Sequence, residues 1–83
     1  MAPSSADEAA ILEVAERLRL QGVDPDSYSL EGGMPDEATV LDELPGGTWS
    51  VYYSERGQRR NERTFNYLDT ALEEVARDLG VWL

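Results

Sequence analysis

Cysteine, histidine and lysine are absent from this 83-residue chain. The absence of the first two limits the kinds of chemistry that the chain can perform. Without cysteine there is no disulfide framework and no thiol chemistry. Without histidine the chain lacks the side chain that most often serves as a general base or a metal ligand. We therefore expect a protein that is not an enzyme and that needs no cofactor.

Long apolar runs are also missing. No stretch approaches the ~20 apolar residues of a membrane-spanning helix, and the N-terminal MAPSSADEAA has neither the basic nor the apolar region of a signal peptide. These features predict a cytoplasmic protein with no membrane partner. The length predicts a single domain over residues 1–83, with a thin core and with residues 1–5 disordered.

Charge is strongly one-sided. The chain has 17 acidic and 7 basic residues, a net charge of −10, and every basic residue is arginine. Residues 1–54 carry a charge of −9, whereas residues 55–83 carry −1. Such a field repels nucleic acid and attracts basic proteins. Solubility alone is an equally simple explanation of the same charge.

The hydrophobic pattern predicts an α+β fold. Apolar residues with helical spacing mark the two ends of the chain, and β-branched and aromatic residues mark its middle. We expect a small antiparallel sheet of three to four strands with the N- and C-terminal helices packed on one face and the other face open. The expected helices cover residues 6–21 and 67–79, and the expected strands cover residues 28–30, 38–44, 48–54 and 59–65.

The segment TWSVYYSERGQRRNERTF, residues 48–65, predicts a β-hairpin. Its turn contains Gly57, which readily takes the positive φ that a tight hairpin requires. Strand alternation predicts that Trp49, Val51 and Tyr53 face the core. Tyr52 is then expected to project from the open face of the sheet.

Three catalytic or ligand-binding interpretations fit poorly. Asp24 and Asp26 begin like a calcium-binding loop, but Pro35 stands where such a loop needs its final glutamate. The paired glycines precede no helix with a P-loop lysine. Adjacent carboxylates such as Glu73 and Glu74 lie in polar stretches, whereas acid–base chemistry needs a carboxyl group in a pocket that shifts its pKa.

Nucleic-acid binding is a further alternative. Arg56, Arg59, Arg60 and Arg63 lie near aromatic residues, a combination typical of single-strand binding. The net charge, the interspersed glutamates and the absence of lysine argue against it. Cross-strand ion pairs explain the same arginines more simply, so we expect no nucleic-acid partner.

One set of residues forms a pattern that a known family shares. It consists of the motif YYSERG, residues 52–57, together with Tyr28, Ser29, Leu30, Gly32, Gly33, Val40, Leu41, Trp49, Val51, Phe65 and Ala71. With this pattern the chain resembles small bacterial immunity proteins encoded beside polymorphic toxins, in particular toxins with an NAD-glycohydrolase domain of the tuberculosis-necrotizing-toxin type. The resemblance spans residues 9–80 and is most specific at residues 52–57.

The resemblance implies a function without catalysis. An immunity protein binds its cognate protein toxin stoichiometrically, at or near the active site, and blocks the toxin's activity. The free protein is then expected to be a monomer or a weak dimer. The alternative from another class is an adaptor or regulatory domain that binds a different basic protein.

Five residues are predicted to contact the partner. Tyr52 is the expected anchor, because tyrosine offers a large contact area at little entropic cost. Glu55 and Arg56 are expected at the tip of the hairpin, where charges can steer association. Tyr28 and Glu31 complete the predicted surface.

Overall fold

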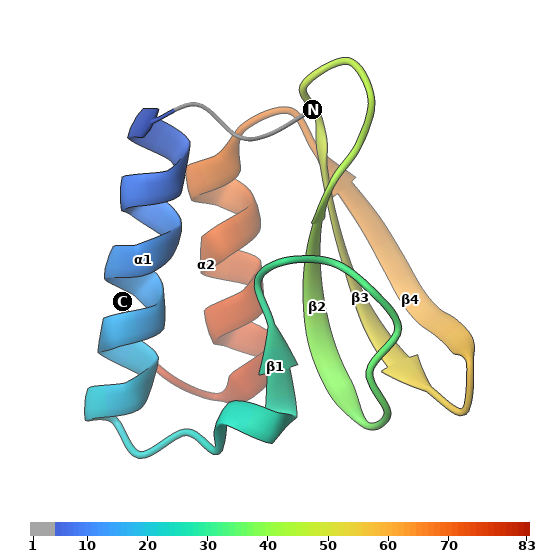
Figure 1. The fold of residues 1–83 in the computed structure, drawn as a ribbon, viewed down its shortest axis with the longest axis horizontal. Helices are drawn as coiled ribbons and strands as arrows, with labels where there is room; N and C mark the ends of the chain where they lie inside the picture. The colour runs from blue at the N-terminus through green and yellow to red at the C-terminus, as the bar shows by residue number, and fades with distance from the viewer. Residues whose placement is uncertain (1–4) are drawn as a thin grey trace.

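The computed structural model describes residues 5–83. The predicted disorder of residues 1–4 lies outside the described part, whereas Ser5, which that prediction included, is the first residue of a helix. The elements follow the order α-β-β-β-β-α, with one extra helical turn before the first strand (Figure 1). The predicted α+β class is confirmed. The elements are α1 (Ser5–Leu20), the 3-10 helix η1 (Pro25–Ser27), β1 (Tyr28–Ser29), β2 (Ala38–Glu43), β3 (Trp49–Glu55), β4 (Gln58–Phe65) and α2 (Leu68–Leu79).

The four strands form one sheet in the order β1-β2-β3-β4. The β2–β3 and β3–β4 pairs are antiparallel, as expected, but β1 pairs with β2 in parallel, so the sheet is mixed. The reason is the path of residues 30–37. They return the chain to the end of the sheet at which β1 begins, so that β2 runs in the same direction as β1.

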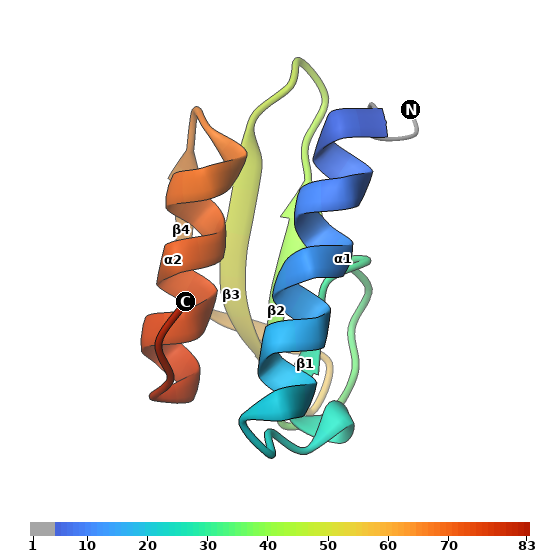
Figure 2. The ribbon, with the colours of Figure 1, turned by 90° about the vertical axis from the view of Figure 1, so that its left-hand side faces the viewer.

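Both helices lie side by side on one face of the sheet (Figure 2). Helix α2 packs on β2, β3 and β4, whereas α1 makes its main contact with α2. Trp49 and Val51 are buried beneath the helices, as predicted. The buried apolar cluster between the layers consists of Val14, Leu18, Leu30, Leu41, Trp49, Val51, Leu68, Ala71, Leu72 and Val75.

The β3–β4 hairpin has the two-residue turn that its sequence predicts. Arg56 and Gly57 have φ values of 51° and 75°, and positive φ at both positions characterises the type I′ turn that favours tight hairpins. Further along, Val51 pairs with Arg63 but Tyr53 pairs with Arg60. Strand β4 therefore contains one extra residue, and this bulge places Asn61 at a φ of 54°.

The second face of the sheet is not open, contrary to our expectation. The segment 30–37 bends over the side of the sheet away from the helices (Figure 1). It is fixed there because the Gly32 amide donates to the Leu41 carbonyl at 2.8 Å. Val40, Ser50 and Tyr52, which point to this side, are consequently inaccessible to solvent.

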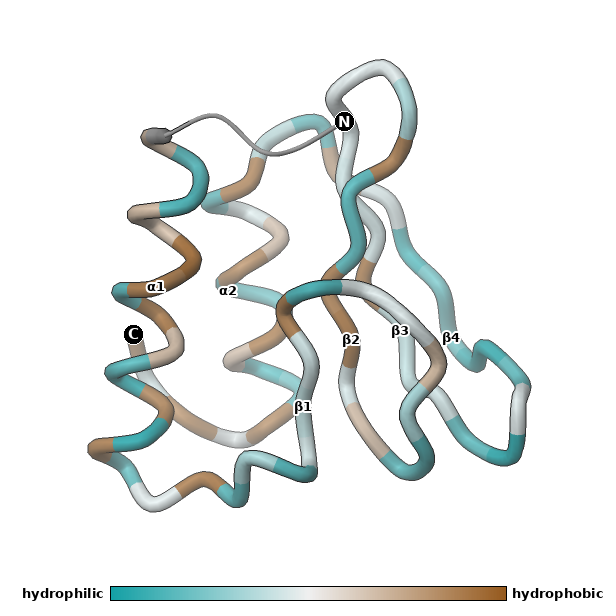
Figure 3. Tube along the Cα trace, in the orientation of Figure 1, coloured by the Kyte–Doolittle hydropathy of each residue, from teal (hydrophilic) through white to brown (hydrophobic). Residues whose placement is uncertain are grey.

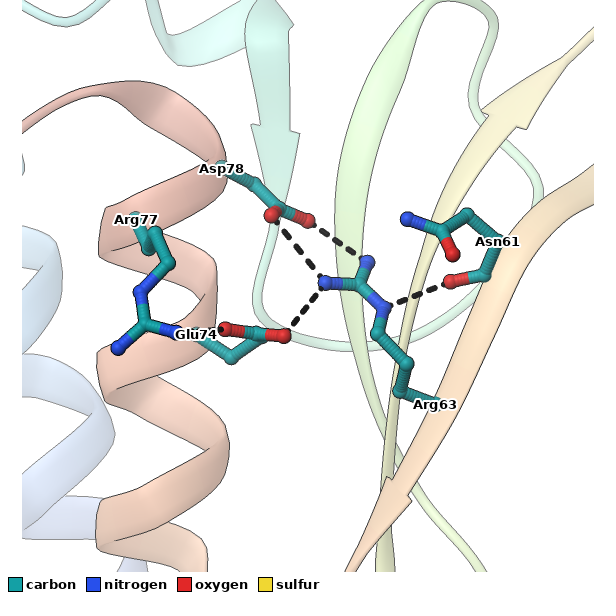
Figure 4. A network of polar contacts seen from close by, with 5 residues as sticks. All are labelled: Asn61, Arg63, Glu74, Arg77 and Asp78. Carbon is teal, nitrogen blue, oxygen red and sulfur yellow. Dashed lines mark hydrogen bonds and ion pairs between the residues drawn. The ribbon is translucent and has the colours of Figure 1, made fainter.

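A network of charged side chains connects strand β4 to α2 (Figure 4). The guanidinium of Arg63 contacts Asp78 at 2.7 Å and Glu74 at 2.8 Å, and its Nε donates to the Asn61 carbonyl at 2.7 Å. The hydrogen bond to Asp78 and then that to Glu74 raise the pKa of Arg63. The network therefore fixes the orientation of the hairpin relative to the helices.

Among residues 5–83, neither helix is long and apolar enough to cross a membrane.

Candidate binding surface

The five predicted contact residues do not form one surface. Tyr52 is buried on the side of the sheet away from the helices, and Glu55 and Arg56 lie at the hairpin turn. Tyr28 and Glu31 lie beside α1, on the edge strand and just after it. The structure thus divides the prediction among three places, each with its own environment.

Tyr52 cannot serve as an exposed anchor. It points away from the helices, as predicted, but 0% of its surface is accessible because the segment 30–37 covers it. Its hydroxyl donates to the Gly33 carbonyl at 2.6 Å, and the guanidinium of Arg59 lies 4.2 Å from the centre of its ring. Burial raises the pKa of the Tyr52 phenol. The prediction of an exposed Tyr52 is therefore wrong, and this side chain has a structural role.

A polar network surrounds Tyr52 on the same side of the sheet. Arg59 contacts Glu62 at 3.0 Å and Asp42 at 3.6 Å. The Ser50 hydroxyl donates to Glu62 at 2.5 Å, and this hydrogen bond, followed by the contacts with Arg59, lowers the pKa of Glu62. Each of these groups has a polar partner, so hydrogen bonds and ion pairs determine how the side chains are arranged on the second face.

Tyr53, the next residue along, is partly exposed to solvent. We predicted it in the core, but it is only half buried. Burial raises the pKa of its phenol, and the nearby carboxylates of Glu37, Glu55 and Asp36 raise it further. We call this group of four residues, Tyr53 with Asp36, Glu37 and Glu55, the acidic corner.

Two loops meet at the acidic corner. The Asp36 carboxylate accepts a hydrogen bond of 2.9 Å from the backbone N–H of Arg56, which joins the segment 30–37 to the hairpin turn. Glu37 and Arg56 both have positive φ, 53° and 51°, a conformation that costs a residue with a side chain about 1–2 kcal/mol. Local backbone preference therefore does not explain why these two residues occupy these positions.

The charges of the corner are only partly neutralised. Glu55 contacts Arg60 at 3.1 Å, but within residues 5–83 neither Asp36 nor Glu37 forms an ion pair, and the guanidinium of Arg56 has no carboxylate partner. The hairpin turn and most of β4 are hydrophilic (Figure 3). Unlike Arg56, the remaining six arginines are paired with acidic side chains: Arg17, Arg19, Arg59, Arg60, Arg63 and Arg77.

Our sequence reasoning missed Asp36, Glu37 and the exposure of Tyr53. The strand register supplies a signal that could have found Glu37. Ala38 pairs with Ser54, so the residue before Ala38 lies opposite Glu55 at the same end of the sheet. The position of Asp36 depends on the path of a glycine-rich loop, which no periodicity specifies.

The described part of the chain offers no arrangement for metal chemistry: residues 5–83 contain no group of three or more side chains of the ligating types placed to hold an ion. What the acidic corner can provide is an aromatic contact surface within a negative field. Comparison with protein-family models, with curated proteins and with solved structures finds no significant match to this chain.

Proposed function

We propose that this chain is an immunity protein that binds a cognate bacterial toxin stoichiometrically in the cytoplasm and blocks it without catalysis of its own. The acidic corner is the observation that carries this proposal. It offers a partly exposed tyrosine among three carboxylates. The resemblance of residues 52–57 to immunity proteins suggests an NAD glycohydrolase as the target.

The corner suits a basic protein surface for two reasons. Tyrosine gives a large, rigid contact area and is enriched among the residues that dominate binding energy. Carboxylates that form no ion pair within residues 5–83, such as Asp36 and Glu37, attract a positively charged partner and accelerate encounter. The unfavourable backbone conformation at Glu37 is consistent with selection for this surface rather than for stability.

The distribution of ion pairs supports a protein partner over nucleic acid. Phosphate binding requires arginines whose charge is available, and each phosphate neutralised needs one such cation. Three of the four hairpin arginines, Arg59, Arg60 and Arg63, are instead paired with carboxylates of this chain, which leaves only Arg56 available. We accordingly propose that the chain does not bind nucleic acid.

The proposal is tested by mixing the purified chain with a toxin domain of the NAD-glycohydrolase type. At equal molar amounts, NAD consumption should stop, and excess toxin should restore it in proportion to the excess. NAD consumption that continues in the presence of saturating chain would contradict the proposal. If a stable complex formed but left NAD consumption unchanged, the adaptor function would replace it.

The role of the acidic corner in this complex can be tested with two variants, each of which replaces one carboxylate by a neutral amide. Glu37→Gln removes an unpaired carboxylate from the corner, and Glu73→Gln removes one from the exposed surface of α2. We expect Glu37→Gln to slow association several-fold at low salt, with little effect at high salt because exposed charges are screened. Equal association rates for the two variants would remove the corner from the interface.

A further inference from the structure

A shallow apolar groove lies between α1 and β1, apart from the acidic corner. It consists of two adjoining hollows of about 370 and 290 Å³, both lined by Leu12, Ala15 and Tyr28. Ile11 and Leu30 extend the apolar lining at one end. Leu12 is 64% exposed, so the groove leaves apolar surface uncovered.

The fold explains why this groove exists. Helix α1 makes its main contact with α2, and β1 is the strand at one edge of the sheet. Figure 2 shows the lower half of α1 in front of β1, and among residues 5–83 no strand pairs with the outer side of β1. The chain also stays alongside β2 after β1 ends, because the Gly32 amide donates to the Leu41 carbonyl.

The outer side of β1 can pair with another strand. An edge strand presents unpaired N–H and C=O groups, which form a template for an added strand. Peptide-binding domains use this arrangement when an extended segment pairs with a sheet edge and places alternate side chains in a neighbouring pocket. Here the free edge and the apolar groove lie together, so an extended ligand could use both.

The rim of the groove determines the charge of the ligand. Glu31 lines one end and Pro25 the other, and Asp24 and Asp26 are the sequence neighbours of Pro25. Within residues 5–83, none of these three carboxylates forms an ion pair. The two remaining charged residues of the lining, Glu16 and Arg19, contact each other through a hydrogen bond of 3.0 Å. The rim is therefore negative, and it favours a positively charged ligand.

We infer that this groove binds an extended basic segment of a partner protein, which adds to β1 as a strand. Apolar side chains at alternate positions of the segment enter the groove beside Leu12 and Tyr28. Its arginines or lysines face the carboxylates of the rim. This site is separate from the acidic corner, and it does not depend on whether the partner is a toxin.

The test uses a short peptide in which arginine and valine alternate, with a glutamate–valine peptide as the control. We expect saturable binding of the arginine peptide below about 1 mM, with NMR shifts at the amides of Ser29, Leu30 and Glu31. Leu12→Arg should weaken this binding about tenfold or more. Leu20→Arg is the matched variant, because Leu20 is equally exposed on α1 but does not line the groove. It should bind the peptide like the unaltered chain.

Several results would overturn the inference. The first is the absence of saturable binding by the arginine peptide. The second is equal binding by the Leu12→Arg and Leu20→Arg variants, which would indicate attraction to the overall charge alone. The third is a set of shifts centred on the hairpin turn. The fourth is a concentration-dependent dimer that Leu12→Arg dissociates, which would assign the edge to a second copy of the chain.

Discussion

The two faces of the sheet are buried in different ways. On the face toward α1 and α2, burial is apolar and comes from packing around residues such as Leu41 and Val51. On the opposite face, the segment 30–37 covers Tyr52, and the contacts are hydrogen bonds and ion pairs with Gly33 and Arg59. On the first face, a substitution is destabilising when it changes the volume of a packed side chain. On the second face, it is destabilising when it removes the hydrogen-bond or ion-pair partner of a polar group.

This difference explains why two adjacent tyrosines lie in different environments. Tyr52 lies on the polar face and is sealed in by the segment 30–37. Tyr53 points toward the helix side but lies at the end of the sheet, where it is only half buried. Side-chain alternation alone therefore does not distinguish an interior residue from a contact residue in such a small sheet.

The largest effect is expected on the helix-covered face. Val51→Asp places a carboxylate with no partner at a position that is 0% exposed, which costs about 4 kcal/mol or more. A domain of this size has little stability in reserve, so we expect the variant to be unfolded. Circular dichroism and urea titration check this, and a variant that melts cooperatively near the original temperature would show that Val51 is not in the core.

The loop-covered face should respond to a smaller change. A Cβ at Gly32, where φ is 73°, would lie 2.5 Å from an Asp42 oxygen, and Asp42 contacts Arg59 above Tyr52. We expect Gly32→Ala to lower the free energy of unfolding by about 2–3 kcal/mol, partly through strain and partly through the clash.

Gly46→Ala provides the control for this substitution. Gly46 also has a positive φ, of 92°, but nothing lies within 4 Å of the added Cβ. This variant should lose only the conformational term, about 1 kcal/mol. Equal losses for the two alanine variants would mean that the segment 30–37 does not press against Asp42.

The smallest effect concerns pH. The hydrogen bond from Ser50, followed by the contacts with Arg59, holds the pKa of Glu62 below its usual value of about 4.3. The stability from this group is therefore present above that value and is lost as the pH falls through the lower pKa of the folded state. Glu62→Gln should reduce the melting temperature slightly at neutral pH, and the difference should vanish once the pH falls below the lowered pKa of Glu62 in the folded state. A difference that persisted in acid would have another cause.

Much of the fold could be predicted from the sequence because its signals are local. Helical spacing of apolar residues predicted both helices, and Gly57 in a polar turn predicted the hairpin with its positive φ. The number of strands was also right. The parallel pairing of β1 was not predicted, because two residues give too short a pattern to indicate strand direction.

The candidate site was harder to predict because it depends on contacts between distant segments. Glu55 and Arg56 were correctly expected at the hairpin turn, but Asp36 comes to them through a loop twenty residues earlier in the chain. The same loop removes Tyr52 from the surface. Nothing in its residues, which include the glycines 32 and 33, indicates by periodicity which face of the sheet it covers.

The adjacent tyrosines give the most direct test of the proposed binding surface. Melting temperature and affinity for the cognate toxin are measured on the same two variants, Tyr52→Phe and Tyr53→Ala. We expect Tyr52→Phe to cost about 1–2 kcal/mol of stability, because the Gly33 carbonyl loses its partner, and to leave affinity unchanged. Tyr53→Ala should remain folded and weaken toxin binding about tenfold or more. Unchanged affinity in a folded Tyr53→Ala variant would contradict the acidic corner as the centre of the interface.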